Sequence, residues 1–376
     1  MRAINASIMR QMNRKMILDQ IRRQPISRVE LAKITKLTRA SVTQIIEELI
    51  EEGLVAETSI VERLRLGRRS TQLAIQADAG AIFGVNLNKT QCSVGAVNLR
   101  GELLAQNVEM VAGRSPDEVL TTVAETIHRQ RCALNQEHTR VLGLGFCAPG
   151  ALDFRCGRIL RAPGLERWDG VPIVDELSRR TGLAVQMENA ANALALEELY
   201  FGVSARAENF ALVQVDETIC AGLVVHGNLY HGAGRHAVQL GHISLDVTGE
   251  PCACGNRGCL EQYLSVPALL SGSPYHSWSE LMEHQAQDDA RKTIERATER
   301  LTYLTVNLIN AFDIERVVLT GELTLRSESV IRQVNQNLAG RTAFDLDGPA
   351  MVCAAGSNPA RVGAMPAYDA LFRVEL

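Results

Sequence analysis

One histidine and three cysteines lie close together in a stretch rich in glycine. The spacing of His242, Cys252, Cys254 and Cys259 is H-x9-C-x-C-x4-C, which supplies the nitrogen and sulfur donors of a closed tetrahedral zinc site. Four protein ligands leave no place for a water molecule, so we expect Zn²⁺ here to shape the loop and not to perform chemistry. The alternative is a group of buried thiols without metal. A C-x-C pair in a glycine-rich loop has little packing value, which favours the metal site.

Composition places the chain among ordinary globular proteins. It has 376 residues, of which 46% are hydrophobic and 22% charged, enough for two or three domains with their own cores. No apolar run approaches the ~18 residues of a membrane span, and MRAINASIMRQMNRK lacks the apolar block of a secretory signal. The six other cysteines lie among apolar residues, which is typical of reduced, buried thiols. We therefore expect a cytoplasmic protein without membrane insertion.

The net charge of −4 conceals an asymmetry. Residues 1–75 carry 14 Lys and Arg against 8 Asp and Glu, whereas the rest carries 25 against 35. A basic end on an acidic body indicates nucleic-acid contact by that end only.

The basic end has the pattern of a winged helix-turn-helix. A helix is expected over 8–23, a second over 28–35 after a capping box formed by Ser27 and Glu30, and a third from Thr38 to Gly53. Two strands, 54–62 and 70–75, are predicted on either side of an arginine-rich loop, which would be the wing.

The third helix of such a module enters the major groove of double-stranded DNA with its N-terminus first. Its base-reading candidates are Arg39, Ala40, Thr43 and Gln44, and Ser41 is expected to meet a phosphate. Arg68 and Arg69 of the wing have the charge and reach to enter a minor groove. A winged helix that binds protein is the alternative, but a basic wing together with a polar recognition face favours operator DNA.

The remaining chain alternates strands and helices as in an α/β domain. Three strands with tight turns at 88–90 and 100–102 are followed by a helix and a buried strand, and the order βββαβ returns after residue 209. We therefore predict a winged helix-turn-helix over 1–78, a first α/β lobe over 79–200 plus 355–376, and a second lobe over 201–354 with the cysteine-rich loop and a dimerisation surface.

A duplicated βββαβ unit resembles the actin-like ATPase (RNase H-like) fold that sugar kinases share. The motifs narrow the resemblance: GH before CACGNRGCLE, APGALD at 148–153, ENAANALALEELYFG at 188–202 and VVLTGELT at 317–324. They resemble blocks of the ROK family (repressors, open reading frames and kinases) in the expected order. With its basic head the chain resembles the repressor branch, which includes xylose, glucose and N-acetylglucosamine repressors.

The resemblance also predicts which kinase functions are absent. The family's first phosphate turn, DxGGT, corresponds here to Asn86-Leu87-Asn88-Lys89-Thr90, and its glycine-rich second turn to residues 217–222, which begin with Glu217. Glu322 replaces a glycine of the adenosine turn, and Ala190 aligns with the catalytic aspartate. Phosphate must approach such turns without obstruction by Cβ atoms. We expect no kinase activity; a ROK sugar kinase with a DNA-binding head is the alternative.

The family's sugar contacts imply a ligand-binding set in this chain. Its members are Glu188, Asn189, Gln239, His242 and Glu261. His242 would hold zinc through one ring nitrogen and a sugar hydroxyl through the other, whereas Ala190 can hold no hydroxyl. Trp168 either stacks on the sugar or fills the core. Two further alternatives remain open: a vestigial cleft that only supports a dimer, and a regulator gated by a protein partner.

Taken together, these features predict a DNA-binding transcriptional regulator, a repressor, with structural zinc and a carbohydrate effector. A homodimer, or a dimer of dimers, would read two half-sites. A sugar bound between the two lobes would change the spacing of the reading heads by preferring one lobe angle.

Overall fold

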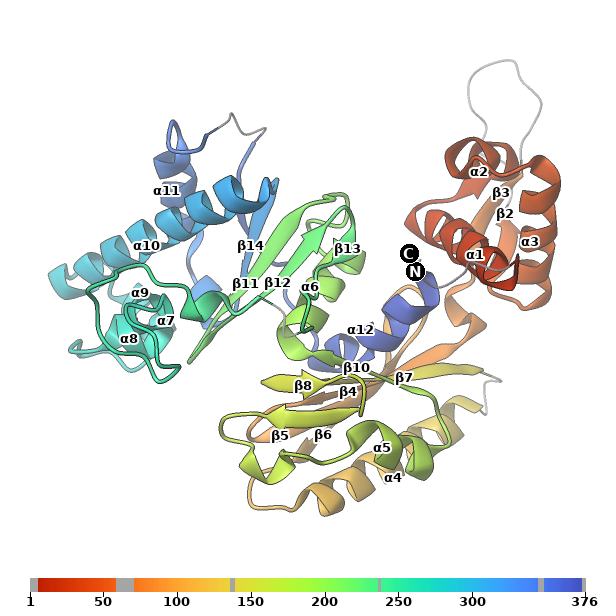
Figure 1. The fold of residues 1–376 in the computed structure, drawn as a ribbon, viewed down its shortest axis with the longest axis horizontal. Helices are drawn as coiled ribbons and strands as arrows, with labels where there is room; N and C mark the ends of the chain where they lie inside the picture. The colour runs from red at the N-terminus through yellow and green to blue at the C-terminus, as the bar shows by residue number, and fades with distance from the viewer. Residues whose placement is uncertain (1–5, 59–70, 136–138, 236–237, 344–347, 374–376) are drawn as a thin grey trace. The chain divides into compact units, whose positions relative to one another are not determined.

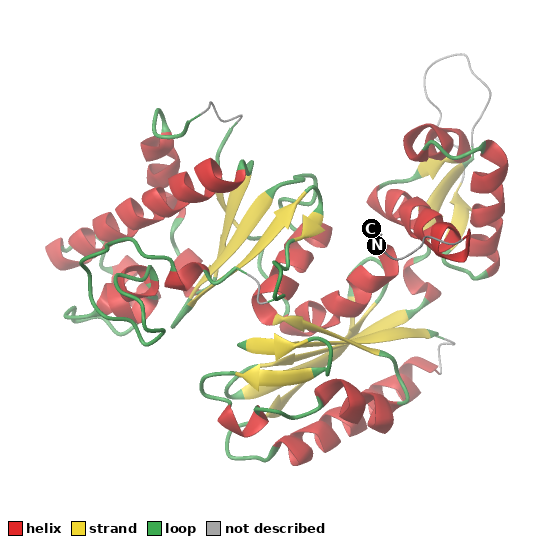
Figure 2. Cartoon of the chain, in the orientation of Figure 1, coloured by secondary structure: helices red, strands yellow, loops and turns green. Residues whose placement is uncertain are grey.

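The computed structural model describes residues 6–58, 71–135, 139–235, 238–343 and 348–373. Its contacts divide the chain into two compact units (Figures 1 and 2). The first comprises the described residues of 1–148, 155–188 and 359–376, and the second those of 149–154 and 189–358. The N-terminal helices thus belong to the same unit as the first lobe, and the three-part division stays a prediction.

The first unit begins with a winged helix-turn-helix fold. Its elements are α1 (Ala6–Arg23), β1 (Ile26–Ser27), α2 (Arg28–Thr35), α3 (Arg39–Glu51), β2 (Val55–Thr58) and β3 (Gln72–Ile75). The strands form an antiparallel sheet of order β1-β3-β2. The capping box is confirmed, since the Ser27 hydroxyl accepts from Glu30 N and the Glu30 carboxylate accepts from Ser27 N. Strand β1 was not predicted because it has only two residues.

The rest of the first unit is a five-stranded sheet with helices on both faces. Its elements are β4 (Ala81–Leu87), β5 (Gln91–Val97), β6 (Leu103–Met110), α4 (Pro116–Asn135), β7 (Val141–Ala148), β9 (Arg158–Arg161), α5 (Ile173–Thr181), β10 (Val185–Asn189) and α12 (Pro359–Phe372), with 3-10 turns η1 (Ala77–Ala79) and η2 (Glu166–Trp168). The strand order is β10-β7-β4-β5-β6. Helices α4 and α5 lie on one face and α12 on the other (Figure 1).

Helix α12 approaches this sheet so closely that glycine is required. A Cβ atom added to Gly84 of β4 would lie 2.3 Å from Ala360 O and from Ala364 N, and one added to Gly145 of β7 would lie 2.3 Å from Gly363 O. Both contacts are with helix backbone, which cannot rotate away. Glycines in β4 and β7 therefore determine where the C-terminal helix packs.

The second unit has its own five-stranded sheet and core. Its elements are β8 (Ala151–Asp153), α6 (Ala190–Phe201), β11 (Phe210–Val215), β12 (Ile219–Val225), β13 (Asn228–Leu229), η3 (Leu240–His242), α7 (Glu261–Leu264), α8 (Val266–Leu270), α9 (Trp278–Glu283), α10 (Asp288–Phe312), β14 (Arg316–Thr320), η4 (Glu322–Thr324), α11 (Glu328–Leu338) and β15 (Met351–Cys353). The strand order is β13-β12-β11-β14-β15. Apolar side chains of the sheet, α8, α9, α10 and α11 form its core.

The two sheets have the same topology, which confirms the predicted duplication. In each, a three-stranded antiparallel meander is extended by a strand parallel to its first member: β7 beside β4 in one and β14 beside β11 in the other. A fifth strand follows on the outer side, β10 in the first sheet and β15 in the second. The βββαβ pattern in the sequence therefore corresponds to two copies of one unit.

Some side chains differ from their predicted environment. Cys132 and Cys156 are exposed and Cys220 and Cys353 are half-buried, so only Cys92 and Cys147 of the six cysteines outside the cluster are buried as expected. Trp168 is 2% exposed and fills the core.

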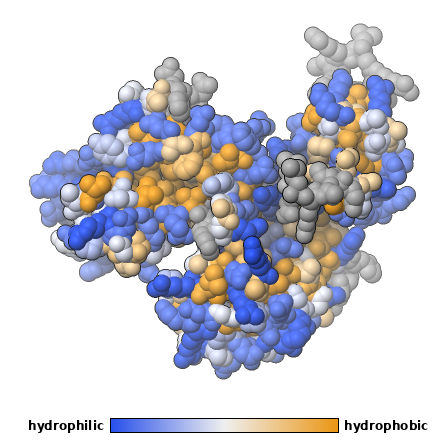
Figure 3. Space-filling model, in the orientation of Figure 1, coloured by the Kyte–Doolittle hydropathy of each residue, from blue (hydrophilic) through white to orange (hydrophobic). Residues whose placement is uncertain are grey.

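Hydrophilic residues cover much of the visible surface of both units (Figure 3). Among the described helices, none combines the length and hydropathy needed to cross a bilayer.

Candidate functional site

The cysteine-rich loop folds back on itself between η3 and α7. Leu245 N donates to Gly258 O and Leu260 N donates to Ile243 O, each at 2.8 Å, so the two ends of the loop run antiparallel. Gly258 has a φ of +60°, and a Cβ atom there would lie 1.7 Å from Asp246 O. Only glycine fits this position. The turn brings Cys259 back beside His242.

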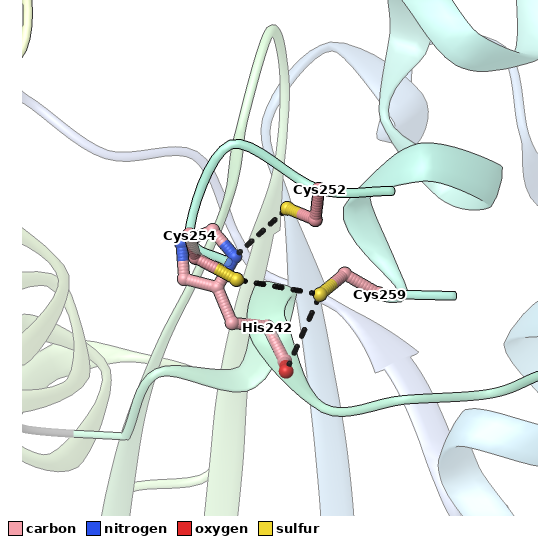
Figure 4. A group of neighbouring side chains, drawn as sticks. All are labelled: His242, Cys252, Cys254 and Cys259. Atoms are coloured by element: carbon pink, nitrogen blue, oxygen red, sulfur yellow. Dashed lines mark hydrogen bonds between the residues drawn. The ribbon is translucent and has the colours of Figure 1, made fainter. Parts of the chain in front are cut away.

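The four predicted ligands converge in this loop (Figure 4). Their donor atoms all lie within 4.8 Å of one another. The Cys252 Sγ to His242 Nδ1 distance is 3.8 Å, and the Cys254 Sγ to Cys259 Sγ distance is 3.6 Å. Zinc–sulfur bonds of about 2.3 Å at tetrahedral angles separate sulfur atoms by about 3.8 Å. The donor set and its spacing therefore fit a four-coordinate zinc ion.

The surroundings of the cluster shift the pKa values of two of its thiols in opposite directions. The backbone N–H of Cys254 lowers the pKa of Cys252 to about 7. Burial, together with the neighbouring Cys252 and Cys254, raises the pKa of Cys259 to about 12. Three thiolates at this separation repel one another, and a divalent cation offsets that repulsion. A zinc ion held by all four side chains would supply structural crosslinking to the loop.

Two neighbours of the cluster were missed by the sequence analysis. The Gln262 side-chain amide donates to Cys252 Sγ at 3.8 Å, and the Asn256 amide donates to His242 O at 3.4 Å. The guanidinium of Arg300, on α10, donates to Tyr263 O and lies 5.4 Å from the Tyr263 ring centre. Gln262 directly follows the CxCGxxGCxE motif. Its position beside the motif was the only feature of the sequence that could have indicated a contact with the cluster.

Three of the predicted ligand-binding residues lie together at the start of β12. Glu261 Oε2 accepts from Ile219 N at 3.0 Å and lies beside Gly241. Gln239 is exposed at the N-terminal end of η3, and His242 is half-buried at its other end. Because Nδ1 of His242 faces Cys252, its Nε2 is the ring nitrogen on the other side.

Asn189 and Glu188 are positioned by the start of α6. The Asn189 side chain caps this helix, accepting from Ala191 N at 2.9 Å, and donates to Gly150 O at 2.8 Å. Glu188 precedes it on β10 and is 5% exposed. A Cβ atom on Gly222 would lie 2.9 Å from Ala191 O, so the start of α6 packs against β12. Asn189 and the η3 group therefore flank the same strand.

The turn that corresponds to the first phosphate turn of the kinases is closed by its own side chain. Asn88 Oδ1 accepts from Thr90 N and from Gln91 N, each at 2.9 Å, and also from the Thr90 hydroxyl. The backbone N–H groups of Thr90 and Gln91 are therefore already paired within this turn.

Acidic side chains also form hydrogen bonds at the predicted adenosine turn and at the residue just before the predicted second phosphate turn, 217–222. Asp216 Oδ1 accepts from Glu322 N at 2.5 Å, and Glu322 Oε1 accepts from Trp278 N at 2.9 Å. The Trp278 indole donates to the Ser327 hydroxyl at 2.8 Å and is fully buried. Glu322 thus joins η4 to the start of α9, and hydrogen bonds within the protein hold the predicted adenosine turn in place.

The predicted DNA-reading residues form the first two turns of α3. Thr38 caps this helix, and its hydroxyl accepts from Ser41 N at 3.2 Å. Arg39, Ala40 and Gln44 are exposed, and Ser41 and Thr43 are half-buried. Arg68 and Arg69 lie outside the described residues. The core side of the helix is formed by Val42, Ile45, Ile46 and Leu49.

Fold and site together define a duplicated, sugar-kinase-like α/β domain that carries a winged helix-turn-helix. The chain belongs to the ROK family, whose model matches residues 82–365. A xylose repressor of Caldicellulosiruptor bescii is 27% identical over 360 residues, covering 90% of this chain and 90% of that protein.

Two further relatives represent the two branches of the family. The crystal structure of a ROK transcriptional regulator, a homologue of the Escherichia coli Mlc protein, superposes with a TM-score of 0.81 at 25% identity and covers 97% of both chains. A glucokinase of Thermotoga maritima is 29% identical over 269 residues, covering 66% of this chain and 83% of that protein. The fold alone therefore does not separate a regulator from an enzyme.

Proposed function

We propose that this protein is a DNA-binding transcriptional regulator, a repressor controlled by a sugar or sugar derivative. The observation that carries the proposal is the winged helix with an exposed polar start of α3, attached to a domain that is similar to a xylose repressor over 90% of the chain. A protein of this kind works in the cytoplasm, where its operator DNA is found.

The DNA contacts follow from the exposure of α3. Arg39 and Gln44 carry the donors that read guanine and adenine, and Ala40 offers a methyl group to thymine. Ser41, at the helix N-terminus, suits a phosphate. Arg68 and Arg69 extend the contact to a minor groove. A single winged helix has a small footprint, so we propose a homodimer, or a dimer of dimers, that reads two half-sites.

The effector site is proposed at Asn189, Gln239, His242 and Glu261, and Glu188, which directly precedes Asn189 in the sequence, is proposed as a further member. Amide, imidazole and carboxylate groups make the paired hydrogen bonds that adjacent sugar hydroxyls require. His242 belongs to both the zinc set and this group, so zinc binding and effector binding are coupled through one side chain. Zn²⁺ is held by His242, Cys252, Cys254 and Cys259.

Kinase activity is the second candidate, since a glucokinase is among the relatives. The internal hydrogen bonds of Asn88, Asp216 and Glu322 oppose it. Ala190 stands where the resemblance requires an acidic base, and such a base contributes ~10²–10⁴-fold in rate. We therefore propose a regulator without phosphoryl transfer.

The proposal is tested by fluorescence anisotropy with duplexes from the promoter region of its own gene. We expect specific binding that Arg39→Ala weakens, and a thermal-shift screen should find a sugar that stabilises the protein by about 2.7 kcal/mol at 100 times its Kd. Indifference to every duplex would contradict the DNA-binding role. ATP turnover with a hexose above background would instead support the kinase.

A further inference from the structure

Helix α3 ends in four acidic residues that divide into two pairs. Glu48 and Glu52 form ion pairs with Arg10 and Arg14 of α1, the second through two hydrogen bonds of 2.5 and 2.6 Å. Glu47 and Glu51 are exposed, and no ion pair or hydrogen bond of either side chain is found within the described part of the chain. Two carboxylates of the helix are neutralised and two project into solvent.

Glu47 lies on the face of α3 that we propose to read DNA. It follows Ala40, Thr43 and Gln44 at i, i+3, i+4 and i+7, the spacing at which base-contacting residues recur on a helix in the major groove. At 1.5 Å per residue, Glu47 lies about 10 Å along the axis from Ala40, within a groove about 12 Å wide. Glu51 lies about 6 Å farther along, toward the groove's exit.

An exposed carboxylate on this face is unfavourable unless it has a donor to meet. DNA phosphates repel the carboxylate. Most of the hydrogen-bonding groups on base edges in the major groove are acceptors, with which a carboxylate cannot form a hydrogen bond. Cytosine presents its N4 amino donor to the major groove without an acceptor on the same base, whereas the N6 amino donor of adenine lies beside the N7 acceptor of that base. We propose that Glu47 is a specificity-determining residue that accepts a hydrogen bond from the N4 amino group of a cytosine in each half-site. This inference rests on the proposed DNA-binding function.

Selection from a randomised duplex pool tests the proposal. Purified wild type, Glu47→Ala and Glu47→Gln are each used to enrich binding sequences, and the preferred base at every position is compared. Wild type should enrich cytosine at one position per half-site. Glu47→Ala should reduce that preference by about tenfold, the usual range for a good base contact being roughly five- to a hundredfold. Glu47→Gln should shift the preference toward adenine, because its amide both donates and accepts.

Glu51→Gln is the matched control, since it removes the same charge from the same face one turn farther on. It should leave every base preference unchanged. If Glu47→Gln tightens binding to all duplexes equally without altering any base preference, Glu47 acts only through charge and the inference is wrong. A change of preference by Glu51→Gln would contradict it as well.

The selection with wild type separates the inference from the proposed function. If wild type enriches no sequence, the proposed function fails and the inference with it. An enriched site without this cytosine overturns the inference alone.

Discussion

At the scale of single residues, the distances within the cysteine cluster distinguish between metal-free thiols and a metal site. Spacing alone left metal-free thiols open, and the distances of 3.6 and 3.8 Å between donor atoms match a tetrahedral ion. The structure also shows which ring nitrogen of His242 faces the cluster, since Nδ1 lies 3.8 Å from Cys252 Sγ.

The cluster gives the first prediction. Replacing Cys252 and Cys254 together by serine should remove bound zinc and lower the free energy of unfolding by more than about 3 kcal/mol, since loss of a metal site is among the most destabilising changes. Elemental analysis and urea unfolding measure the two effects. Cys132→Ser, at an exposed thiol outside the cluster, is the control. Wild-type protein without zinc, or a double variant of unchanged stability, would contradict the metal site.

Glu322 gives the second prediction, because the structure assigns it a role within the protein. Glu322→Ala removes the acceptor for Trp278 N and should cost about 1–2 kcal/mol of stability, measured by thermal unfolding. Glu322→Gln keeps an acceptor oxygen and should cost less. Neither variant should bind ATP, since the Asn88 and Asp216 hydrogen bonds remain. Nucleotide binding by Glu322→Ala, detected by calorimetry, would show that this side chain alone blocks the site.

At the scale of elements, α12 depends on glycine in the sheet beneath it, which gives the third prediction. Gly84→Ala places a Cβ atom 2.3 Å from helix backbone and should destabilise the protein by about 3 kcal/mol, the upper end for overpacking. Gly143→Ala, on β7 under the same helix, meets only the Ala367 Cβ at 3.3 Å, so we expect less than about 1 kcal/mol. Urea unfolding compares the pair, and equal losses would argue against backbone contact as the cause.

At the scale of the whole molecule, two units with separate sheets should respond separately to metal loss. This is the fourth prediction. Chelation of zinc should raise hydrogen exchange in residues 243–264 and in the neighbouring turn of α10, because these segments join at Arg300 and Tyr263. Amides of α3 and β4 belong to the other unit and should keep their protection. Mass spectrometry after exchange measures both regions, and a uniform increase would show that the chain unfolds as one cooperative body.

The sequence by itself determined several of the elements and brought the four residues of the cluster to attention. Helix caps at Ser27 and Thr38, the repeated βββαβ order and the ligands of the cluster are local or repeated patterns, and local backbone preferences act over a few residues. Only the tertiary structure decided which distant groups meet. Asp216 bonds Glu322 across 106 positions, and α12 packs on Gly84 from the opposite end of the chain. Such contacts depend on how sheets and helices pack, and no local pattern records a partner that lies far away in sequence.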